Sequence, residues 1–300
     1  MQEAADSCLA IERPRELGDV RRFSHEAMAT VFEVYAVHPD KGYAAQAAQA
    51  AFDLTDRLER ELSRFVPNSD ITRINRLAAG ESTRVSPTTL ECLVIARHML
   101  ELTHGAFDIA IGTGLPSLEL DAGDFMVRAT TDDVRIDLGG IGKGYAVDLM
   151  AELLEEWGIQ VALVHGGFSS VLALDAPEDR DGWPLTLSDP AAPSRVLARL
   201  SVRQKALGAS GLRKGDHIVD PRTGQPAGGR IAAWVSVPRP RVAEGSGAAH
   251  RAAAGAVTDA LTTAFMLLSL EEIRELCERT PGLEAWLLET HLLHIGGSAA

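Results

Sequence analysis

The sequence predicts an α+β protein, built as a single domain from a mixed, largely antiparallel sheet packed with helices. Hairpin-like strand patterns are mixed with helical patterns, whereas a doubly wound sheet would alternate strand and helix strictly. No internal repeat and no long linker divides the chain. With 300 residues, of which 46% are hydrophobic, the chain is long enough to bury a sizeable core.

The composition argues against binding to nucleic acid or to a membrane. The formal net charge of −13 disfavours nucleic acid and anionic membrane surfaces, so a phosphate site must be built from local cations. The cysteines Cys8, Cys92 and Cys277 are too far apart for a disulfide framework or a metal site. No apolar run is long enough for a transmembrane segment or a signal-peptide core, so the expected location is cytoplasmic.

The first half of the chain predicts a strand followed by helices. Residues 1–22 are polar and are expected to form an irregular extension, with the domain occupying residues 23–300. Residues 23–37 carry the aromatic and β-branched side chains of a strand, and residues 44–65 have helical apolar spacing. A second helix is expected after the N-cap Ser86, with Pro87 in its first turn and Gly105 beyond its end. The segment between these two helices is expected to be a polar loop.

The second half mixes hairpins with helices. A short, turn-rich region is followed by a helix that ends at Gly158, and then by two strands around a Gly-Gly turn. Further short strands and turns lead to a helix from Ala256, a second helix and two terminal strands.

The segment "IDLGGIGKGYAVD", residues 136–148, places glycines and a lysine between a strand and a helix. It is not a dinucleotide fingerprint, because Tyr145 stands where the third glycine is needed. It is not a Walker loop either, because Asp137 and Gly144 stand where glycine and Ser or Thr are required. One interpretation is close packing that glycine permits. The other is an anion site, because Lys143 falls in a first helical turn whose N–H groups favour a ligand phosphate.

The segment "TDALTTA" places Asp259 and Thr263 at i and i+4, with Thr262 beside them. Carboxylate and hydroxyl oxygens on one helical face suit Mg²⁺, although Asp and Thr near a helix start also serve as caps. This placement on a helix face predicts that Asp259→Ala leaves the fold intact.

The segment "HIVDPRTGQP" is explained by turn chemistry, and it contains His217 and Arg222. His217 is either a structural residue or a base that takes a proton from an attacking hydroxyl near neutral pH. Arg222 either pairs with a phosphate or is solvated.

Together these segments resemble the ApbE family of FAD-dependent protein flavin transferases. The matching stretches, in the family's order from about residue 23 to 270, are "EAMATVFEV", "LSRFVPNSDITRIN", "GAFDIAIG", "IDLGGIGKGYAVD", "HGGFSSV", "ASG", "HIVDPRTGQP" and "TDALTTA". The resemblance implies a T-fold-related domain that transfers FMN from FAD to a Thr or Ser hydroxyl of an acceptor protein, with release of AMP.

The resemblance also implies site residues. His217 would be the base, beside FAD, and Asp259 the catalytic carboxylate. The FAD groove would be formed by Met28, Phe65, Ala106, Phe107, Asp108, Asp137 and Lys143, although an apolar aromatic such as Phe107 is also ordinary core. A main-chain carbonyl near Gly140 would join Asp259, Thr262 and Thr263 around Mg²⁺.

Two residues depart from the family pattern. Ala29 stands where glycine is usual, and Phe168 stands where an acidic residue is frequent. Loops near the site are also shortened, so two alternatives remain: an FAD pyrophosphatase that yields FMN and AMP, and a non-catalytic FAD-binding protein.

Overall fold

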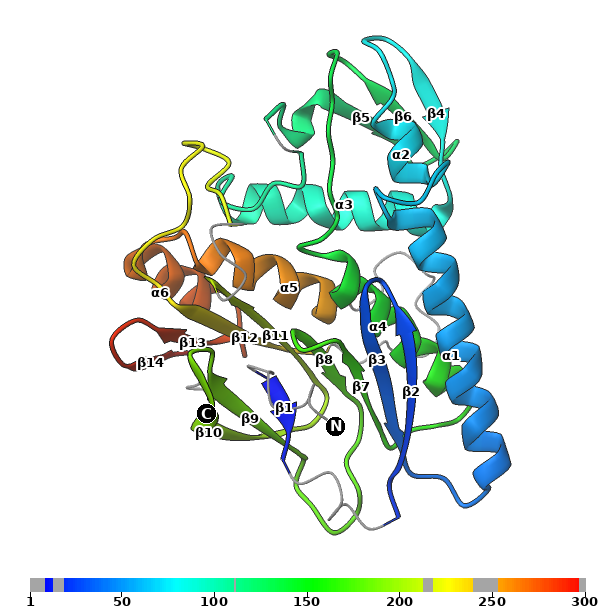
Figure 1. Ribbon diagram of the computed structural model, residues 1–300, viewed down its shortest axis with the longest axis vertical. Helices are drawn as coiled ribbons and strands as arrows, with labels where there is room; N and C mark the ends of the chain where they lie inside the picture. The colour runs from blue at the N-terminus through cyan, green and yellow to red at the C-terminus, as the bar shows by residue number, and fades with distance from the viewer. Residues whose placement is uncertain (1–8, 13–18, 111, 213–217, 240–252, 297–300) are drawn as a thin grey trace.

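An eight-stranded antiparallel sheet forms the centre of the computed structural model (Figure 1). The structure describes residues 9–12, 19–110, 112–212, 218–239 and 253–296. In spatial order, the strands of this sheet are β14 (Leu292–Ile295), β13 (Glu284–Leu288), β12 (Ala232–Pro238), β11 (Lys205–Gly211), β8 (Ser170–Ala173), β7 (Ala162–Gly166), β3 (Thr30–Ala36) and β2 (Arg21–Ala27). All neighbouring strands in it are antiparallel, which confirms the predicted α+β class.

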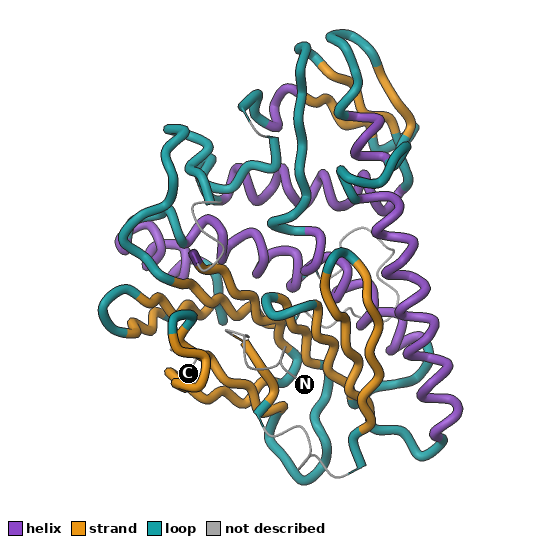
Figure 2. The backbone as a smooth tube through the Cα atoms, in the orientation of Figure 1, coloured by secondary structure: helices purple, strands orange, loops and turns teal. Residues whose placement is uncertain are grey.

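Helices cover one face of this sheet, as Figures 1 and 2 show. They are α1 (Lys41–Leu62), α3 (Pro87–Leu102), α4 (Gly142–Glu156), α5 (Ala254–Phe265) and α6 (Leu270–Arg279). α4 packs on β7 and β8, α5 packs on β11 and β12, and the two helices pack against each other. The larger hydrophobic core lies between this layer and the sheet.

A second sheet covers the opposite face. It consists of β1 (Leu9–Ile11), β9 (Trp183–Asp189) and β10 (Ala192–Val202), in the order β1-β9-β10. Because strand side chains alternate between faces, Ala233 and Val235 of β12 enter the larger core while Trp234 enters a smaller one shared with Trp183 and Leu9. The middle strands of the central sheet, such as β7 and β8, are therefore buried on both faces.

A small sheet and a short helix lie at one end of the helical layer. The sheet has the order β4-β6-β5, from β4 (Ser82–Arg84), β6 (Met126–Ala129) and β5 (Leu118–Asp121), and β5 follows the 3₁₀ helix η3 (Leu115–Ser117). The short helix is α2 (Asp70–Ile74).

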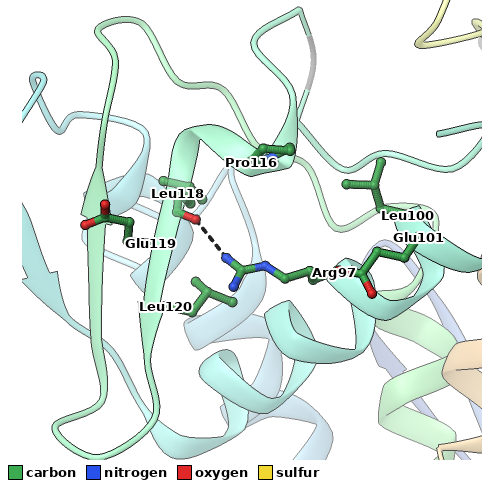
Figure 3. Close-up of a pocket in the computed structure, with 7 residues that line it drawn as sticks. All are labelled: Arg97, Leu100, Glu101, Pro116, Leu118, Glu119 and Leu120. Carbon is green, nitrogen blue, oxygen red and sulfur yellow. Dashed lines mark hydrogen bonds between the residues drawn. The ribbon is translucent and has the colours of Figure 1, made fainter. Parts of the chain in front are cut away.

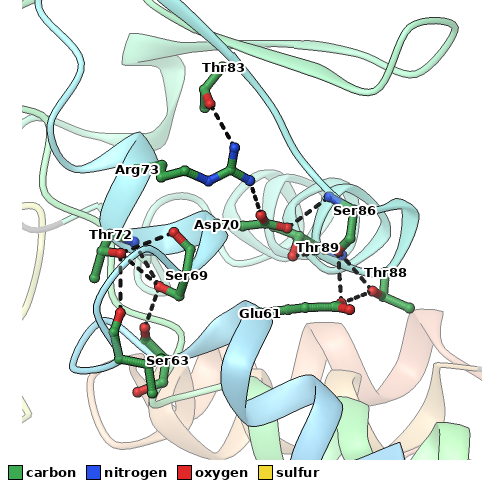
Figure 4. Close-up of polar contacts among 11 residues, drawn as sticks. Glu61, Ser63, Ser69, Asp70, Thr72, Arg73, Thr83, Ser86, Thr88 and Thr89 are labelled. Carbon is green, nitrogen blue, oxygen red and sulfur yellow. Dashed lines mark hydrogen bonds and ion pairs between the residues drawn. The ribbon is translucent and has the colours of Figure 1, made fainter.

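Polar side chains tie α2 to its neighbouring helices (Figure 4). Buried Asp70 accepts a hydrogen bond from the Ser86 N–H at 2.8 Å and pairs with Arg73. At the end of α1, Glu61 accepts hydrogen bonds from the hydroxyls of Ser86, at 2.8 Å, and Thr88. The segment that links α1 to α3 is thereby held in place.

The structure confirms the elements whose ends carry clear signals. The Ser86 hydroxyl caps α3 by accepting from the Thr89 N–H at 3.1 Å, and Gly105 and Gly158 follow their helices with φ of +80° and +73°. The Gly-Gly turn between β7 and β8 is also confirmed.

Three segments differ from expectation. Residues 23–37 lie in a hairpin rather than in one strand. The sequence did not predict the hairpin because its turn is formed by Met28 and Ala29, which are not typical turn residues. The expected loop between α1 and α3 contains α2, whose N-cap is Ser69. Within the expected extension, residues 9–11 form β1, because they pair with β9 and place Leu9 in the smaller core.

Candidate functional site

The candidate site lies where the first turns of α4 and α5 touch. A Cβ on Gly144 would collide with the carbonyl oxygen of Gly255, and a Cβ on Gly255 would collide with the carbonyl oxygen of Gly144. Only glycine permits this backbone contact, so close packing accounts for one glycine of the glycine-lysine segment. The two helix N-termini, whose first N–H groups lack partners within their own helices, are thus held together.

Asp259 lies inside this helix pair and is only 5% exposed. Its Oδ2 accepts a hydrogen bond from the Gly144 N–H at 2.7 Å, and its Oδ1 accepts one from the Ser170 hydroxyl, also at 2.7 Å. Burial raises the pKa of the Asp259 carboxyl, while Lys143 and these hydrogen bonds oppose the rise. The carboxylate therefore caps α4, not its own helix.

The sequence predicts that Asp259→Ala leaves the fold intact, whereas this geometry predicts that the substitution lowers stability. Alanine would leave the Gly144 N–H and the buried Ser170 hydroxyl without an acceptor, and such groups cost about 1–3 kcal/mol each. Asp259 is therefore a structural residue as well as a candidate ligand.

The hydroxyls of Thr262 and Thr263 contact the main-chain carbonyl oxygen of Asp259. Thr262 Oγ1 donates to the Asp259 carbonyl oxygen at 2.8 Å and accepts from the Ser210 hydroxyl at 2.9 Å. Thr263 Oγ1 lies 3.3 Å from the same carbonyl oxygen. A Cβ on Gly140 would lie 3.6 Å from Thr263 Oγ1, which places the glycine-lysine segment beside the threonines.

This set of donors fits Mg²⁺. Among the described residues, no group of three or more His, Cys, Asp or Glu side chains is arranged to hold a metal. A cation here would instead be held by one carboxylate with hydroxyl and main-chain oxygens, the hard ligands that Mg²⁺ prefers. The Asp259 carboxylate has about four lone-pair positions and uses two of them for hydrogen bonds, so it retains positions for a cation.

Asp137, Arg64 and Phe65 form a second group at the start of the glycine-lysine segment. Asp137 accepts from the Gly139 N–H at 2.9 Å and forms an ion pair with Arg64 Nε at 3.0 Å. The Arg64 guanidinium lies 4.4 Å from the ring centroid of Phe65, which is 79% exposed. Sequence reasoning selected Asp137 and Phe65 but missed Arg64, whose only signal was its position next to Phe65.

Asn75 holds Ile136, where the glycine-lysine segment begins; the strand expected before this segment is only an isolated bridge between Ile136 and Ala110. Its Nδ2 donates to the Ile136 carbonyl oxygen at 3.0 Å, and its Oδ1 accepts from the Ile136 N–H at 2.7 Å. Sequence reasoning gave Asn75 no role, although it ends one of the quoted stretches.

The predicted groove residues 106–108 are largely structural. Ala106 and Phe107 are buried, and a Cβ on Gly140 would lie 3.2 Å from the Phe107 ring. Asp108 accepts from the Ala110 N–H at 2.8 Å and from the Leu115 N–H at 3.2 Å, and burial raises the pKa of its carboxyl. Phe107 is therefore a core residue, and its ring also packs against Gly140.

Met28 lies at the tip of the β2–β3 hairpin, which rests on the turn between β7 and β8. The Gly167 N–H donates to the Val31 carbonyl oxygen at 2.9 Å, and the Thr30 side chain lies against Gly167. The same turn carries Phe168, which is 41% exposed, and leads to Ser170. The hairpin tip thus contacts the turn that leads to Ser170, and Ser170 in turn donates to Asp259.

His217 lies outside the described residues. The turn after it is confirmed: the Gly224 N–H donates to the Asp220 carbonyl oxygen at 2.8 Å. Arg222 is paired with Asp220 through two 2.9 Å hydrogen bonds, and its stem lies 3.5 Å from a Cβ built on Gly105. Arg222 is therefore held beside the start of the predicted groove.

A separate pocket of about 460 Å³ lies between α3 and β5 (Figure 3). Across it, the Arg97 guanidinium donates to the Leu118 carbonyl oxygen at 2.7 Å. None of the predicted site residues lines this pocket.

Fold and site together describe an α+β protein whose paired helices present a carboxylate and hydroxyls beside a glycine-lysine segment. The model of the ApbE family matches residues 28–116 and 113–287, and the chain belongs to this family. Across the described residues, no helix combines the length and apolar character needed to cross a membrane.

Solved structures share the fold. The flavin transferase ApbE from Vibrio cholerae superposes with a TM-score of 0.77 at 19% identity, over 93% of this chain and 98% of that one. The flavinyl transferase ApbE from Pseudomonas stutzeri, in its apo form, has a TM-score of 0.76 at 21% identity, over 93% and 94% of the two chains.

Sequence relatives carry the name FAD:protein FMN transferase. One, from Klebsiella pneumoniae (strain 342), is 25% identical over 266 residues, which are 74% of this chain and 75% of the relative. Another, from Salmonella typhimurium, is 24% identical over 308 aligned positions, covering 88% of this chain and 82% of the relative.

Proposed function

We propose that this chain is an Mg²⁺-dependent FAD:protein FMN transferase. Membership of the ApbE family and relatives of that name support the proposal. The structural observation that carries it is the buried Asp259 carboxylate at the junction of two helix N-termini, on the same helix as Thr263, whose hydroxyl lies near Gly140.

The reaction joins the oxygen of an acceptor Thr or Ser hydroxyl to the FMN phosphorus and breaks the bond from that phosphorus to the AMP oxygen. The hydroxyl loses its proton, and AMP leaves as a phosphate. Bound Mg²⁺ would neutralise negative charge on the diphosphate and on the departing phosphate.

The residues of the chain supply binding and orientation. Lys143, in the first turn of α4, offers positive charge to the diphosphate. Asp259, Thr262, Thr263 and the Gly140 main chain would hold the metal. Phe65 offers an exposed aromatic face at the rim for a flavin or adenine ring. His217 is proposed as the base that accepts the hydroxyl proton.

Incubation with FAD, Mg²⁺ and a threonine-bearing acceptor peptide tests this function. We expect flavin fluorescence that stays on the peptide after denaturation, together with one AMP per labelled peptide. AMP without labelled peptide would instead support the pyrophosphatase, and intact bound FAD without products would support a binding protein.

Asp259→Asn is the matched variant for this assay, because it keeps the side-chain volume but removes the charge. We expect it to bind FAD and to lose Mg²⁺-dependent release of AMP. Unchanged Mg²⁺-dependent turnover in a folded Asp259→Asn protein would contradict the metal assignment.

A further inference from the structure

Asp148 is a buried carboxylate that the proposed reaction does not use. It lies in the second turn of α4 and is 3% exposed. Its Oδ1 accepts from the Gly255 N–H at 2.7 Å, and its Oδ2 accepts from the Ala256 N–H at 2.8 Å. Burial raises the pKa of this carboxyl, and the two N–H donors oppose the rise. Asp148 therefore caps the first turn of α5 from a different helix.

Asp148 and Asp259 are reciprocal. Asp148 of α4 receives N–H groups from the start of α5, and Asp259 of α5 receives the Gly144 N–H from the start of α4. Two helix N-termini that touch bring their positive dipole ends together, and a carboxylate at each end offsets that repulsion. The close contact between the Gly144 and Gly255 backbones restricts sliding of α4 against α5.

The two ends of α5 are held by different side chains. At its C-terminal end, buried Arg230 donates to the carbonyl oxygens of Phe265 and Leu268, the latter at 2.9 Å. At its N-terminal end, the caps come from Asp148. Loss of Asp148 would therefore release the N-terminal end of α5, whose first turn contacts α4.

We propose that Asp148 is a positioning residue for the metal-binding face of α5. By capping the first turn of that helix, it holds in place the three residues that would bind the cation, Asp259, Thr262 and Thr263. This inference rests on the proposed function, because that function supplies the metal. Asp148 itself touches neither metal nor substrate.

The test measures Mg²⁺ binding without turnover. The thermal unfolding of wild type and Asp148→Asn is followed across a Mg²⁺ titration with no FAD present, and Mn²⁺ binding is read by electron paramagnetic resonance. Asp148→Asn keeps the side-chain shape but replaces one acceptor by an amide donor that faces an N–H group. We expect the apparent dissociation constant for the metal to rise by about tenfold or more, as for loss of an outer-shell partner.

Leu9→Ala is the control for a general loss of stability, because Leu9 is fully buried in the smaller core, on the face of the central sheet opposite α5. It should lower the melting temperature while the metal dissociation constant stays within about twofold of wild type, because α5 and its caps are intact. Equal loss of metal affinity in both variants would show general loosening and would overturn the role of Asp148.

Two other results also bear on whether Asp148 positions the metal-binding residues. Wild-type metal affinity in a folded Asp148→Asn protein would overturn the positioning role while leaving the proposed function intact. Absence of any metal binding by wild type, both without FAD and with FAD added, would overturn both.

Asp148→Glu serves if the asparagine variant does not fold. It retains the charge but displaces the carboxylate by one methylene. A weaker metal affinity than wild type supports the positioning role, and an unchanged affinity overturns it.

Discussion

Ala29 adopts a backbone conformation that glycine favours. It has φ of +56°, and Met28 before it has φ of +50°, so both central residues of the two-residue hairpin turn are left-handed. Such a turn matches the twist of the strands but needs positive φ at both positions, which is why Asn-Gly is its preferred sequence. The hairpin tip beside the site is therefore strained at two non-glycine residues.

Ala29→Gly should stabilise the protein. A left-handed conformation costs an L-residue about 1–2 kcal/mol, and the extra freedom of glycine in the unfolded chain offsets part of the gain. We expect the free energy of unfolding in urea to rise by up to about 1 kcal/mol. Ala47→Gly, inside α1, is the control and should lower it by about 1 kcal/mol. A destabilised Ala29→Gly protein would contradict the strain at this turn.

His165 should make stability depend on pH. It is 5% exposed on β7, and burial lowers the pKa of its imidazole below the usual 6.5, although Glu33 opposes this. As pH falls through 6.5, the unfolded chain binds a proton that the folded chain does not, so the free energy of unfolding decreases. Above that pH the contribution is constant.

Chemical unfolding at several pH values checks this prediction. The stability of wild type relative to His165→Gln should fall on acidification from pH about 7.5 to about 5.5, a window that spans the usual titration of histidine. A stability difference that does not change with pH would show that His165 is not held neutral in the fold.

At the scale of elements, the α2 segment and the glycine-lysine segment form one unit. Arg64 at one end pairs with Asp137, and Asn75 at the other end holds both main-chain groups of Ile136. Two successive residues, Ile136 and Asp137, are thereby fixed from a segment far away in the sequence. The polar contacts in Figure 4 hold α2 itself against α1 and α3.

Asn75→Ala should weaken FAD binding and destabilise the fold. Ile136 is 1% exposed, so its main-chain groups would lose their partners, at a cost of about 1–3 kcal/mol each. We expect a higher dissociation constant for FAD, measured by flavin fluorescence. Asn75→Asp, which retains the acceptor for the Ile136 N–H, should lie between wild type and alanine. Wild-type FAD affinity in both variants would contradict this role.

The sequence predicted elements where the signal was local. Ser86 and Gly158 mark helix ends by their own chemistry, and the spacing of Asp259 and Thr263 follows from helix geometry alone. The β2–β3 turn was missed because Met28 and Ala29 are not turn residues. Arg64, Asn75, Asp148 and Ser170 were missed because their partners are brought together only by tertiary structure.

At the scale of the molecule, the central sheet separates two cores with different roles. The larger core supports the helices that carry the site, while the smaller core lies on the opposite face with Leu9, Trp183 and Trp234. Residues in the expected N-terminal extension thus contribute to stability, far from Asp259.

Leu9→Ala should therefore lower stability without affecting the site. Leu9 is fully buried, and truncation of a buried leucine costs about 2–5 kcal/mol. We expect a lower melting temperature and an unchanged dissociation constant for FAD below that temperature. A loss of FAD affinity in the folded variant would show that the two faces of the sheet are coupled.

The proposed function depends on one cation held between the glycine-lysine segment and α5. An anomalous difference map from a crystal grown with Mn²⁺ and FAD tests it most directly. We expect a peak within bonding distance of Asp259 and the threonine oxygens, next to the diphosphate. A bound FAD with no peak at that position, or with the metal held by other residues, would contradict it.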